Sequence, residues 1–338
     1  MRVAINGFGR IGRIFLRNVI SDPEIQVIAI NDLADTETLA HLFKYDSVHR
    51  TFNGTVASDA GNLYINGKSI KVLSEREPAK LPWAELDIDL VIESTGKFTA
   101  KTGAGQHLAA GAKQVIISAP SPDKDVPSIV IGVNDDSVDL HSPIISNASC
   151  TTNNVAVMVK ILDDNWGIID GYITTVHSMT GDQSLHDAPH KDLRRARAAS
   201  ASIIPTSTGA AKAITHIFPH LDGKLGGAGI RVPVLNGSLT DFTCSLKIPA
   251  TVEEINKVFK LAAEGPMKNI LEYTEDPIVS TDILGNPHSC IFDSKLTSVV
   301  GGLVKVVGWY DNEMGYSSRL AELVAKISVA KHDQVYSA

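Results

Sequence analysis

Short runs of β-branched and other apolar residues alternate with helix-like or turn-rich segments over the first 149 residues. The runs that predict strands are residues 3–6, 26–30, 90–93, 114–118, 129–133 and 144–146. This alternation is typical of βαβ units, in which helices cover a parallel sheet. Residues 48–66 instead carry the turn signals Asn53-Gly54 and Asn66-Gly67, which predict an inserted hairpin region. The first part of the chain is therefore expected to be a decorated α/β domain.

The pattern changes near Ser149, where we place a domain boundary. Predicted helices at residues 153–165, 209–217 and 252–263 lie between longer strand-like runs at 171–176, 239–248 and 303–310. This order favours an α+β domain with a mixed or antiparallel sheet. Apolar residues recur at helical spacing over 316–331 and predict an amphipathic C-terminal helix. We expect one domain at 1–149, completed by the helix 315–338, and a second at 150–314.

Composition narrows the class of protein. The 338 residues are 43% hydrophobic and 20% charged, which is typical of a globular protein rather than a disordered or fibrous one. The formal net charge of -7 gives no general electrostatic reason to bind nucleic acid or an anionic membrane. No apolar run reaches the length of a membrane span, and no export leader is visible, so we expect a cytoplasmic protein.

A glycine motif follows the first predicted strand directly. Gly7, Gly9 and Gly12 form G-x-G-x-x-G at the start of a helical stretch, and Asp32 ends the next predicted strand, 20 residues after Gly12. This context is that of a Rossmann-type dinucleotide site. The first glycine permits a tight turn, the second lets a pyrophosphate approach the backbone, and the third allows close helix packing. A carboxylate at Asp32 favours NAD over NADP; the alternative is a glycine turn that only packs strand against helix.

Of three widely spaced cysteines, Cys150 is the candidate nucleophile. It follows Ser149, a suitable helix cap, in a run of small polar residues before an apolar helix. Unpaired N–H groups at a helix start favour a thiolate, so we expect a lowered thiol pKa. Cys244 and Cys290 lie in apolar strand-like surroundings and are interpreted as structural. The odd number and spacing predict neither a disulfide framework nor a zinc site.

His177 lies where a predicted strand meets a loop. From there an imidazole could reach Cys150 to hold an ion pair with the thiolate, orient the reacting oxygen or carry a proton, although a structural or surface role remains the alternative. Ser207-Thr208-Gly209 before a helix, Thr180 with Asp182, and Arg231 between apolar neighbours have the character of anion sites. Arg231 could instead pair with a structural carboxylate, and the basic run 191–197 is interpreted as a solvated or interface segment.

These segments together resemble the phosphorylating glyceraldehyde-3-phosphate dehydrogenase family. The resemblance is collinear over nearly the whole chain. It rests on residues 6–13, 146–153, 190–197, 207–212, 231–233 and 309–316 and on the loop after His177. It implies oxidation of D-glyceraldehyde 3-phosphate with NAD, and its phosphorylation by inorganic phosphate to 1,3-bisphosphoglycerate. The implied path runs through a thiohemiacetal and a thioester on Cys150, with His177 as the partner of the thiol.

The resemblance also implies residue roles. The cofactor residues would be Arg10, Ile11, Asp32, Arg76, Thr95, Ser118 and Asn312, the last orienting the nicotinamide carboxamide, with Tyr316 nearby. The substrate phosphate would contact Thr180, Asp182 and Arg231, and the attacking phosphate Ser149, Thr151, Thr208, Gly209 and Arg231. No metal is implied. The family forms homotetramers, in which the segment 178–202 reaches a neighbouring cofactor site.

The chain departs from the family pattern at a few positions. Asn154 stands where many relatives carry a second cysteine, and Ser178-Met179 and Met314 replace the common Ala-Tyr and Trp. Ala188 stands where many NAD-preferring members have Leu, whereas Leu33 and Pro189 keep the NAD pattern. Two other functions stay open on the residues: erythrose-4-phosphate dehydrogenase, which tends to lose the Thr208-Gly209 pattern, and a non-catalytic NAD-binding protein.

Overall fold

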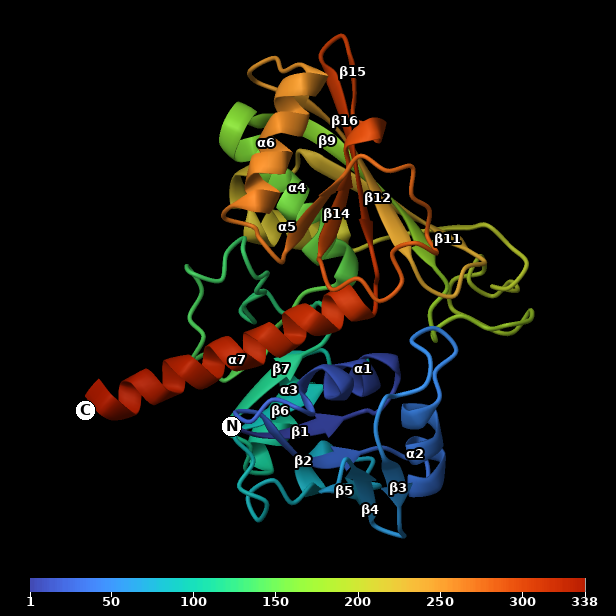
Figure 1. Ribbon diagram of the computed structural model, residues 1–338, viewed down its shortest axis with the longest axis vertical. Coiled ribbons are helices and arrows are strands. Elements are labelled where there is room, and N and C mark those ends of the chain that lie inside the picture. Colours follow the sequence, from blue (N-terminus) through green and yellow to red (C-terminus); the bar gives the residue numbers. More distant parts are fainter. Residues whose placement is uncertain (338) are drawn as a thin grey trace. The chain divides into compact units, whose positions relative to one another are not determined.

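The computed structural model describes residues 1–337, with side chains described for residues 1–330. The chain forms two compact units (Figure 1). Unit 1 comprises residues 1–129, 137–148 and 317–338, and unit 2 comprises residues 130–136 and 149–316. The chain therefore passes between the units within the segment that precedes Cys150, and again within the C-terminal helix.

Unit 1 is built on a mostly parallel sheet of eight strands, as the alternating pattern predicted. The strands are β1 (Arg2–Asn6), β2 (Gln26–Asn31), β3 (Val56–Ser58), β4 (Asn62–Ile65), β5 (Lys68–Leu73), β6 (Leu90–Glu93), β7 (Gln114–Ile117) and β8 (Ile144–Ser146). Their order is β3-β4-β5-β2-β1-β6-β7-β8, and every pair from β5 to β8 is parallel. Asn66 and Gly67, with φ of 50° and 79°, form the turn of the predicted hairpin between β4 and β5.

Three helices of unit 1 connect these strands: α1 (Arg10–Val19), α2 (Thr36–Lys44) and α3 (Lys101–Ala109). The side chain of Asp35 caps α2 by accepting the N–H of Thr38. The start of α1 has no side-chain cap. An uncapped helix start after a glycine turn is the arrangement that phosphate-binding turns use.

The strand predicted at residues 129–133 is wrong. Only an isolated bridge between Ser128 and Ser146 forms there. Asn134 Oδ1 accepts the N–H of Val130 at 2.8 Å, and Asp135 Oδ1 accepts the N–H of Gly132 at 2.6 Å. These side chains occupy the donors that a sheet ladder would need, so the apolar run folds into a turn.

A buried polar network lies at the carboxyl ends of β1 and β6 in unit 1. Glu93 Oε2 accepts Asn6 Nδ2 at 2.6 Å and His107 Nε2 at 3.0 Å, while Oε1 accepts the N–H of Thr95 at 2.8 Å and its hydroxyl. The indole N–H of Trp83 donates to His107 Nδ1 at 2.9 Å, which leaves the proton of that ring on Nε2. One buried carboxyl group thus joins the ends of β1 and β6, helix α3 and the turn at Thr95.

Unit 2 contains a mixed sheet, in agreement with the predicted α+β domain. Its strands are β9 (Ile168–Ser178), β10 (Ile204–Thr206), β11 (Leu225–Val232), β12 (Ser238–Leu246), β13 (Leu271–Thr274), β14 (Cys290–Asp293), β15 (Ser298–Val300) and β16 (Leu303–Tyr310). The order is β10-β11-β9-β12-β16-β14-β13, with β15 paired to β16. The pairs β9–β11 and β13–β14 are parallel and the others antiparallel.

The helices α4 (Cys150–Trp166), α5 (Ala210–Ile217) and α6 (Val252–Glu264) gather on one face of this sheet (Figure 1). Helix α4 is buried along almost its whole length and packs on β9, β12, β14 and β16. A rigid, buried helix therefore carries Cys150 at its first position. The last helix, α7 (Met314–Ser337), corresponds to the predicted C-terminal helix, and residue 338 lies outside the described residues.

Replacing Glu93 by Gln tests the buried network of unit 1. The amide would turn N–H groups toward donors of Asn6 and His107, or of Thr95, and leave buried groups unpaired. We expect a loss of about 2 kcal/mol in stability, seen as a thermal unfolding midpoint lowered by roughly 5 °C. The exposed Glu85→Gln is the matched control. Equal midpoints for the two variants would contradict the role given to the network.

Candidate active site

The glycine turn of unit 1 is packed so tightly that two of its glycines cannot be replaced without movement. Gly7 has a φ of +93°, and a Cβ there would lie 2.7 Å from the backbone N of Thr95. A Cβ on Gly12 would lie 2.4 Å from the carbonyl oxygen of Gly7. A Cβ on Gly9 would meet nothing within 4 Å, so the space above that residue is open. The turn is therefore tightly packed at Gly7 and Gly12 and open at Gly9, as a site for a pyrophosphate requires.

A cavity of about 320 Å³ opens beside this turn. It is lined by Asn6, Gly7, Gly9, Asn31, Asp32, Leu33, Glu75, Arg76, Ser94, Thr95, Lys97 and Phe98. Asp32 accepts the N–H of Phe8 at 2.8 Å and that of Ala34 at 3.0 Å, one on each carboxylate oxygen. Each oxygen keeps a further acceptor position, so the carboxylate is fixed and can still bind hydroxyl groups.

Three other candidate cofactor residues of unit 1, Arg10, Ile11 and Ser118, do not line this cavity. Arg10 donates to Asp46 at 2.5 and 3.1 Å. Burial opposes the shift, but these hydrogen bonds lower the pKa of Asp46 to about 2. The Arg10 side chain is thus engaged with Asp46, and Ile11 is partly buried beside it in the first turn of α1. Ser118 follows β7 and donates its N–H to the carbonyl of Glu93 at 2.9 Å.

In unit 2, the cap predicted for the cysteine helix is present. Ser149 has extended backbone, and its Oγ accepts the N–H of Thr152 at 3.0 Å. Cys150 is the first residue of α4 and is partly exposed. Its Sγ lies 3.4 Å from Nε2 of His177, which projects from the end of β9. The structure therefore brings together the two candidate catalytic residues.

Two groups meet Nδ1 on the far side of the His177 ring. The carbonyl oxygen of Ser178 lies 2.8 Å from Nδ1, and Arg231 Nη1 lies 2.9 Å from Nδ1 and donates to the same carbonyl at 3.0 Å. When Nδ1–H donates to the carbonyl, Nε2 is unprotonated and faces the thiol. In that tautomer His177 can accept the proton of Cys150.

The expected lowering of the Cys150 pKa is wrong for the free protein. Burial raises the pKa of the thiol, and the positive charge of Arg231 and hydrogen bonds at the start of α4 oppose this only in part. Burial and Arg231 also lower the pKa of His177 to about 4. The sequence argument considered the helix start but could not include the surrounding packing. Burial therefore favours the neutral form of both the thiol and the imidazole in the free protein.

The other two cysteines are free and buried, as expected of structural thiols. Burial raises the pKa of Cys244 to about 12, and it also raises the pKa of Cys290. A thiol with such a pKa is not ionised at neutral pH and is a poor nucleophile. Cys150, beside an imidazole and at an accessible helix start, is distinct from both.

Tyr310 is a residue of the site that the sequence analysis did not single out. Its buried hydroxyl lies 2.9 Å from Thr151 Oγ1 and 2.9 Å from Thr175 Oγ1. Its ring meets the ring of His177 edge-on, with centroids 6.0 Å apart. Thr151, a candidate phosphate ligand, thus has its hydroxyl engaged with Tyr310. An aromatic residue at the end of a strand gave no local signal for this contact between β16, α4 and β9.

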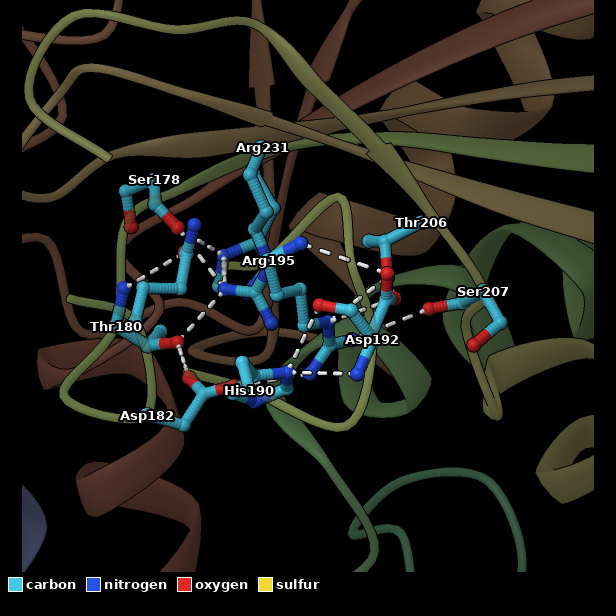
Figure 2. A network of polar contacts seen from close by, with 11 residues as sticks. Ser178, Thr180, Asp182, His190, Asp192, Arg195, Thr206, Ser207 and Arg231 are labelled. Atoms are coloured by element: carbon cyan, nitrogen blue, oxygen red, sulfur yellow. Dashed lines mark hydrogen bonds and ion pairs between the residues drawn. The ribbon is translucent and has the colours of Figure 1, made fainter. Parts of the chain in front are cut away.

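The candidate anion residues of the loop after β9 form one network (Figure 2). Arg231 Nη1 donates to Thr180 Oγ1 at 3.0 Å, and that hydroxyl donates to Asp182. Arg195 pairs with Asp182 at 2.9 Å and donates to Thr206 at 2.8 Å. Burial opposes the shift, but the Thr180 hydroxyl and the guanidinium groups lower the pKa of Asp182.

Arg195 belongs to the basic run that was interpreted as a solvated or interface segment, and it is not a solvated residue. Its side chain is only 22% exposed and takes part in the network. Two guanidinium groups thus flank Thr180 and Asp182. Nearby in sequence, Thr208 Oγ1 accepts the N–H of Ala210 at 3.2 Å, and exposed Gly209 begins α5 without a side-chain cap.

Asn312 is held by three donors on one oxygen. Its Oδ1 accepts Ser178 Oγ at 2.9 Å, Ser238 Oγ at 2.9 Å and the N–H of Gly237 at 3.2 Å. These contacts identify the oxygen side of the amide. Nδ2 finds no acceptor among the described residues, so its two donors are available to a ligand. Tyr316 is buried in the first turn of α7.

Neither a metal site nor a membrane-spanning helix is found in the described part of the chain. No three His, Cys, Asp or Glu side chains come together there as a metal site would require. None of the helices in residues 1–337 has the length and apolar character needed to span a bilayer.

The fold and site define a class: a two-unit protein that combines a dinucleotide-type sheet and glycine turn with a thiol–imidazole pair. Two family models match the chain. The NAD binding domain of glyceraldehyde 3-phosphate dehydrogenase covers residues 1–101, and its C-terminal domain covers residues 149–312. The chain belongs to the glyceraldehyde-3-phosphate dehydrogenase family.

Curated relatives agree with this assignment over nearly their whole length. Glyceraldehyde-3-phosphate dehydrogenase of Mycobacterium avium is 55% identical over 334 residues, covering 97% of this chain and 98% of the relative. Glyceraldehyde-3-phosphate dehydrogenase 2 of Streptomyces avermitilis is 54% identical over 326 residues, covering 96% and 97%. Glyceraldehyde-3-phosphate dehydrogenase 1 of Bacillus subtilis is 52% identical over 330 residues, covering 97% and 98%.

Replacing Arg231 by Gln tests the electrostatics of the thiol. Because the charge of Arg231 lowers the pKa of Cys150, its removal should raise that pKa. We expect the pH profile of iodoacetamide alkylation to move to higher pH. Lys257→Gln, an exposed cation on α6, should leave the profile unchanged. Superimposable profiles for wild type and Arg231→Gln would refute this account.

Proposed function

We propose that the protein oxidises D-glyceraldehyde 3-phosphate with NAD and phosphorylates it with inorganic phosphate, giving 1,3-bisphosphoglycerate. The observation that carries this proposal is the approach of Cys150 Sγ to His177 Nε2, at 3.4 Å, in a member of this family. A thiol beside a base can form the covalent acyl intermediate that links an oxidation to a phosphorylation. The names of the full-length relatives support the same substrate.

NAD fits the residues of unit 1. Gly7 and Gly9, with the uncapped start of α1 at Arg10 and Ile11, would hold the pyrophosphate, and Gly12 would keep that helix close to the sheet. Asp32 would bind the adenosine ribose hydroxyls, with Arg76, Thr95 and Ser118 at the same edge of the sheet. In unit 2, Asn312 would orient the carboxamide through its available Nδ2, beside Tyr316. Bound NAD supplies the acceptor for a hydride.

Cys150 and His177 would perform the covalent steps. As Sγ bonds to the aldehyde carbon, the thiol proton passes to Nε2, which returns it to the carbonyl oxygen and gives a thiohemiacetal. Nε2 takes up the hydroxyl proton when that carbon loses its hydride, and a thioester on Sγ remains. The backbone N–H of Cys150, at the start of α4, would stabilise negative charge on the oxygen. The neutral His177 of the free protein suits the first transfer.

Two anion sites would receive the phosphate groups. Thr180, Asp182 and Arg231 would surround the substrate phosphate, and Ser149, Thr151, Thr208, Gly209 and Arg231 the attacking phosphate. The two guanidinium groups of the network, Arg231 and Arg195, favour a dianion at this place. Attack of a phosphate oxygen on the thioester carbon would break the C–S bond, and the proton held by His177 would return to Sγ.

We further propose a homotetramer that acts in the cytoplasm. Leu185, Leu193 and Ile203, in the segment after β9, are 65%, 81% and 71% exposed, which supports an interface in this part of the chain. Three free cysteines are consistent with a reducing compartment.

Replacing Cys150 by Ser should abolish turnover, because the hydroxyl neither matches the thiol as a nucleophile nor forms a thioester. We expect NADH formation from NAD and glyceraldehyde 3-phosphate to fall by at least ~10³-fold, measured at 340 nm. Cys244→Ser is the matched control and should retain activity.

Omitting phosphate from the wild-type assay should leave only a burst of about one NADH per site, since the thioester then persists. Sustained turnover without phosphate, or a preference for erythrose 4-phosphate, would exclude the proposed phosphate sites. Binding of NAD without any turnover would favour a non-catalytic protein.

Replacing Asp32 by Ala should weaken the preference for NAD. The carboxylate bonds the ribose hydroxyls and repels a 2′-phosphate, so its loss should bring the kcat/KM values for NAD and NADP at least ~10-fold closer. Asp59→Ala, an exposed carboxylate on the neighbouring hairpin, is the control. An unchanged ratio in Asp32→Ala would assign cofactor choice elsewhere.

A further inference from the structure

Ser178, the last residue of β9, uses every one of its polar groups. Its N–H donates to Ser238 Oγ at 3.1 Å, and its hydroxyl donates to Asn312 Oδ1 at 2.9 Å. Its carbonyl oxygen accepts His177 Nδ1 at 2.8 Å and Arg231 Nη1 at 3.0 Å. Ser178 is completely buried, so water cannot replace these partners. Figure 2 shows it beside Arg231.

The hydrogen bonds that Asn312 Oδ1 accepts favour one orientation of its amide. Rotating the amide by 180° would place Nδ2 against the hydroxyls of Ser178 and Ser238 and the N–H of Gly237. The N–H of Gly237 would then face a donor, and the two hydroxyls could accept from Nδ2 only by losing the acceptor of their own protons, at a residue that is only 6% exposed. The observed orientation instead leaves Nδ2 without a protein acceptor. The hydroxyl of Ser178 therefore helps to fix which end of the amide a ligand meets.

We infer that Ser178 is a positioning residue that couples the cofactor side of the site to its base and its anion side. Through its hydroxyl it fixes the Asn312 amide that would hold the nicotinamide carboxamide. Through its carbonyl it fixes the ring of His177 and the guanidinium of Arg231. This inference rests on the proposed function, because it assigns NAD as the ligand of Asn312.

The two functions of Ser178 are separable. Ser178→Ala removes the hydroxyl and keeps the backbone carbonyl, so the contacts of His177 and Arg231 remain. We expect the KM for NAD to rise roughly 3–10-fold, which corresponds to one buried hydrogen bond. The KM for glyceraldehyde 3-phosphate and the rate of Cys150 alkylation by iodoacetamide should stay at the wild-type values. Ser178→Thr retains the hydroxyl and should restore the KM for NAD.

A double-mutant cycle with Asn312→Asp distinguishes positioning from a general loss of stability. A carboxylate has two oxygens and no orientation to fix, so Ser178→Ala should have no further effect on the KM for NAD in the Asn312→Asp background. Additive effects in that cycle would overturn the inference. The control is Ser289→Ala, which removes a buried hydroxyl that has no hydrogen-bond partner in the described residues and should leave the KM unchanged.

The outcomes separate the inference from the proposed function. Absence of NAD- and phosphate-dependent turnover in the wild type refutes the proposed function. Normal turnover in the wild type with an unaltered KM for NAD in Ser178→Ala refutes the inference alone. If Ser178→Ala does not fold, the cycle is measured with Ser178→Cys, whose thiol is a weaker donor. A KM for NAD in Ser178→Cys equal to that of the wild type would then overturn the inference.

Discussion

The hydrogen bond between His177 Nδ1 and the carbonyl of Ser178 is the constraint on which the candidate chemistry depends. It fixes the direction of the imidazole, and in the tautomer whose Nδ1–H donates to this carbonyl a lone pair of Nε2 meets the thiol at 3.4 Å. The same carbonyl accepts Arg231, so the base and the anion-binding cation are aligned by one backbone atom. This atom belongs to β9, an interior strand of the sheet, and loops alone would not hold it as firmly.

In unit 1, the ends of parallel strands align the groups of the candidate cofactor site. Its parallel strands deliver their carboxyl ends to one edge, where the tight turn at Gly7, the carboxylate of Asp32 and the hydroxyl of Thr95 border one cavity. Buried Glu93 joins the ends of β1 and β6 by accepting the amide of Asn6 and the ring of His107. The positions of the groups around the cavity therefore depend on a buried carboxyl group that does not itself line the cavity.

The sequence was informative where a signal is local. The glycine spacing, the carboxylate at Asp32 and the cap at Ser149 act within a few residues of the elements they define, and each was predicted. The thiol pKa and the turn at 129–133 were predicted wrongly, and the contacts of Tyr310 and Glu93 were not foreseen. Those features depend on burial or on partners far along the chain, which residue patterns do not reveal.

Asn154 lies one helical turn after Cys150 and is completely buried. Its Nδ2 bridges the carbonyls of Ser289 at 3.3 Å and Trp309 at 3.2 Å, so it ties α4 to the strands beneath it. A thiol in its place could form neither bridge as well, but it would give Cys150 a partner on the same helix. In this chain the position secures the helix by hydrogen bonding, and Cys150 has no cysteine one helical turn away with which to form a disulfide.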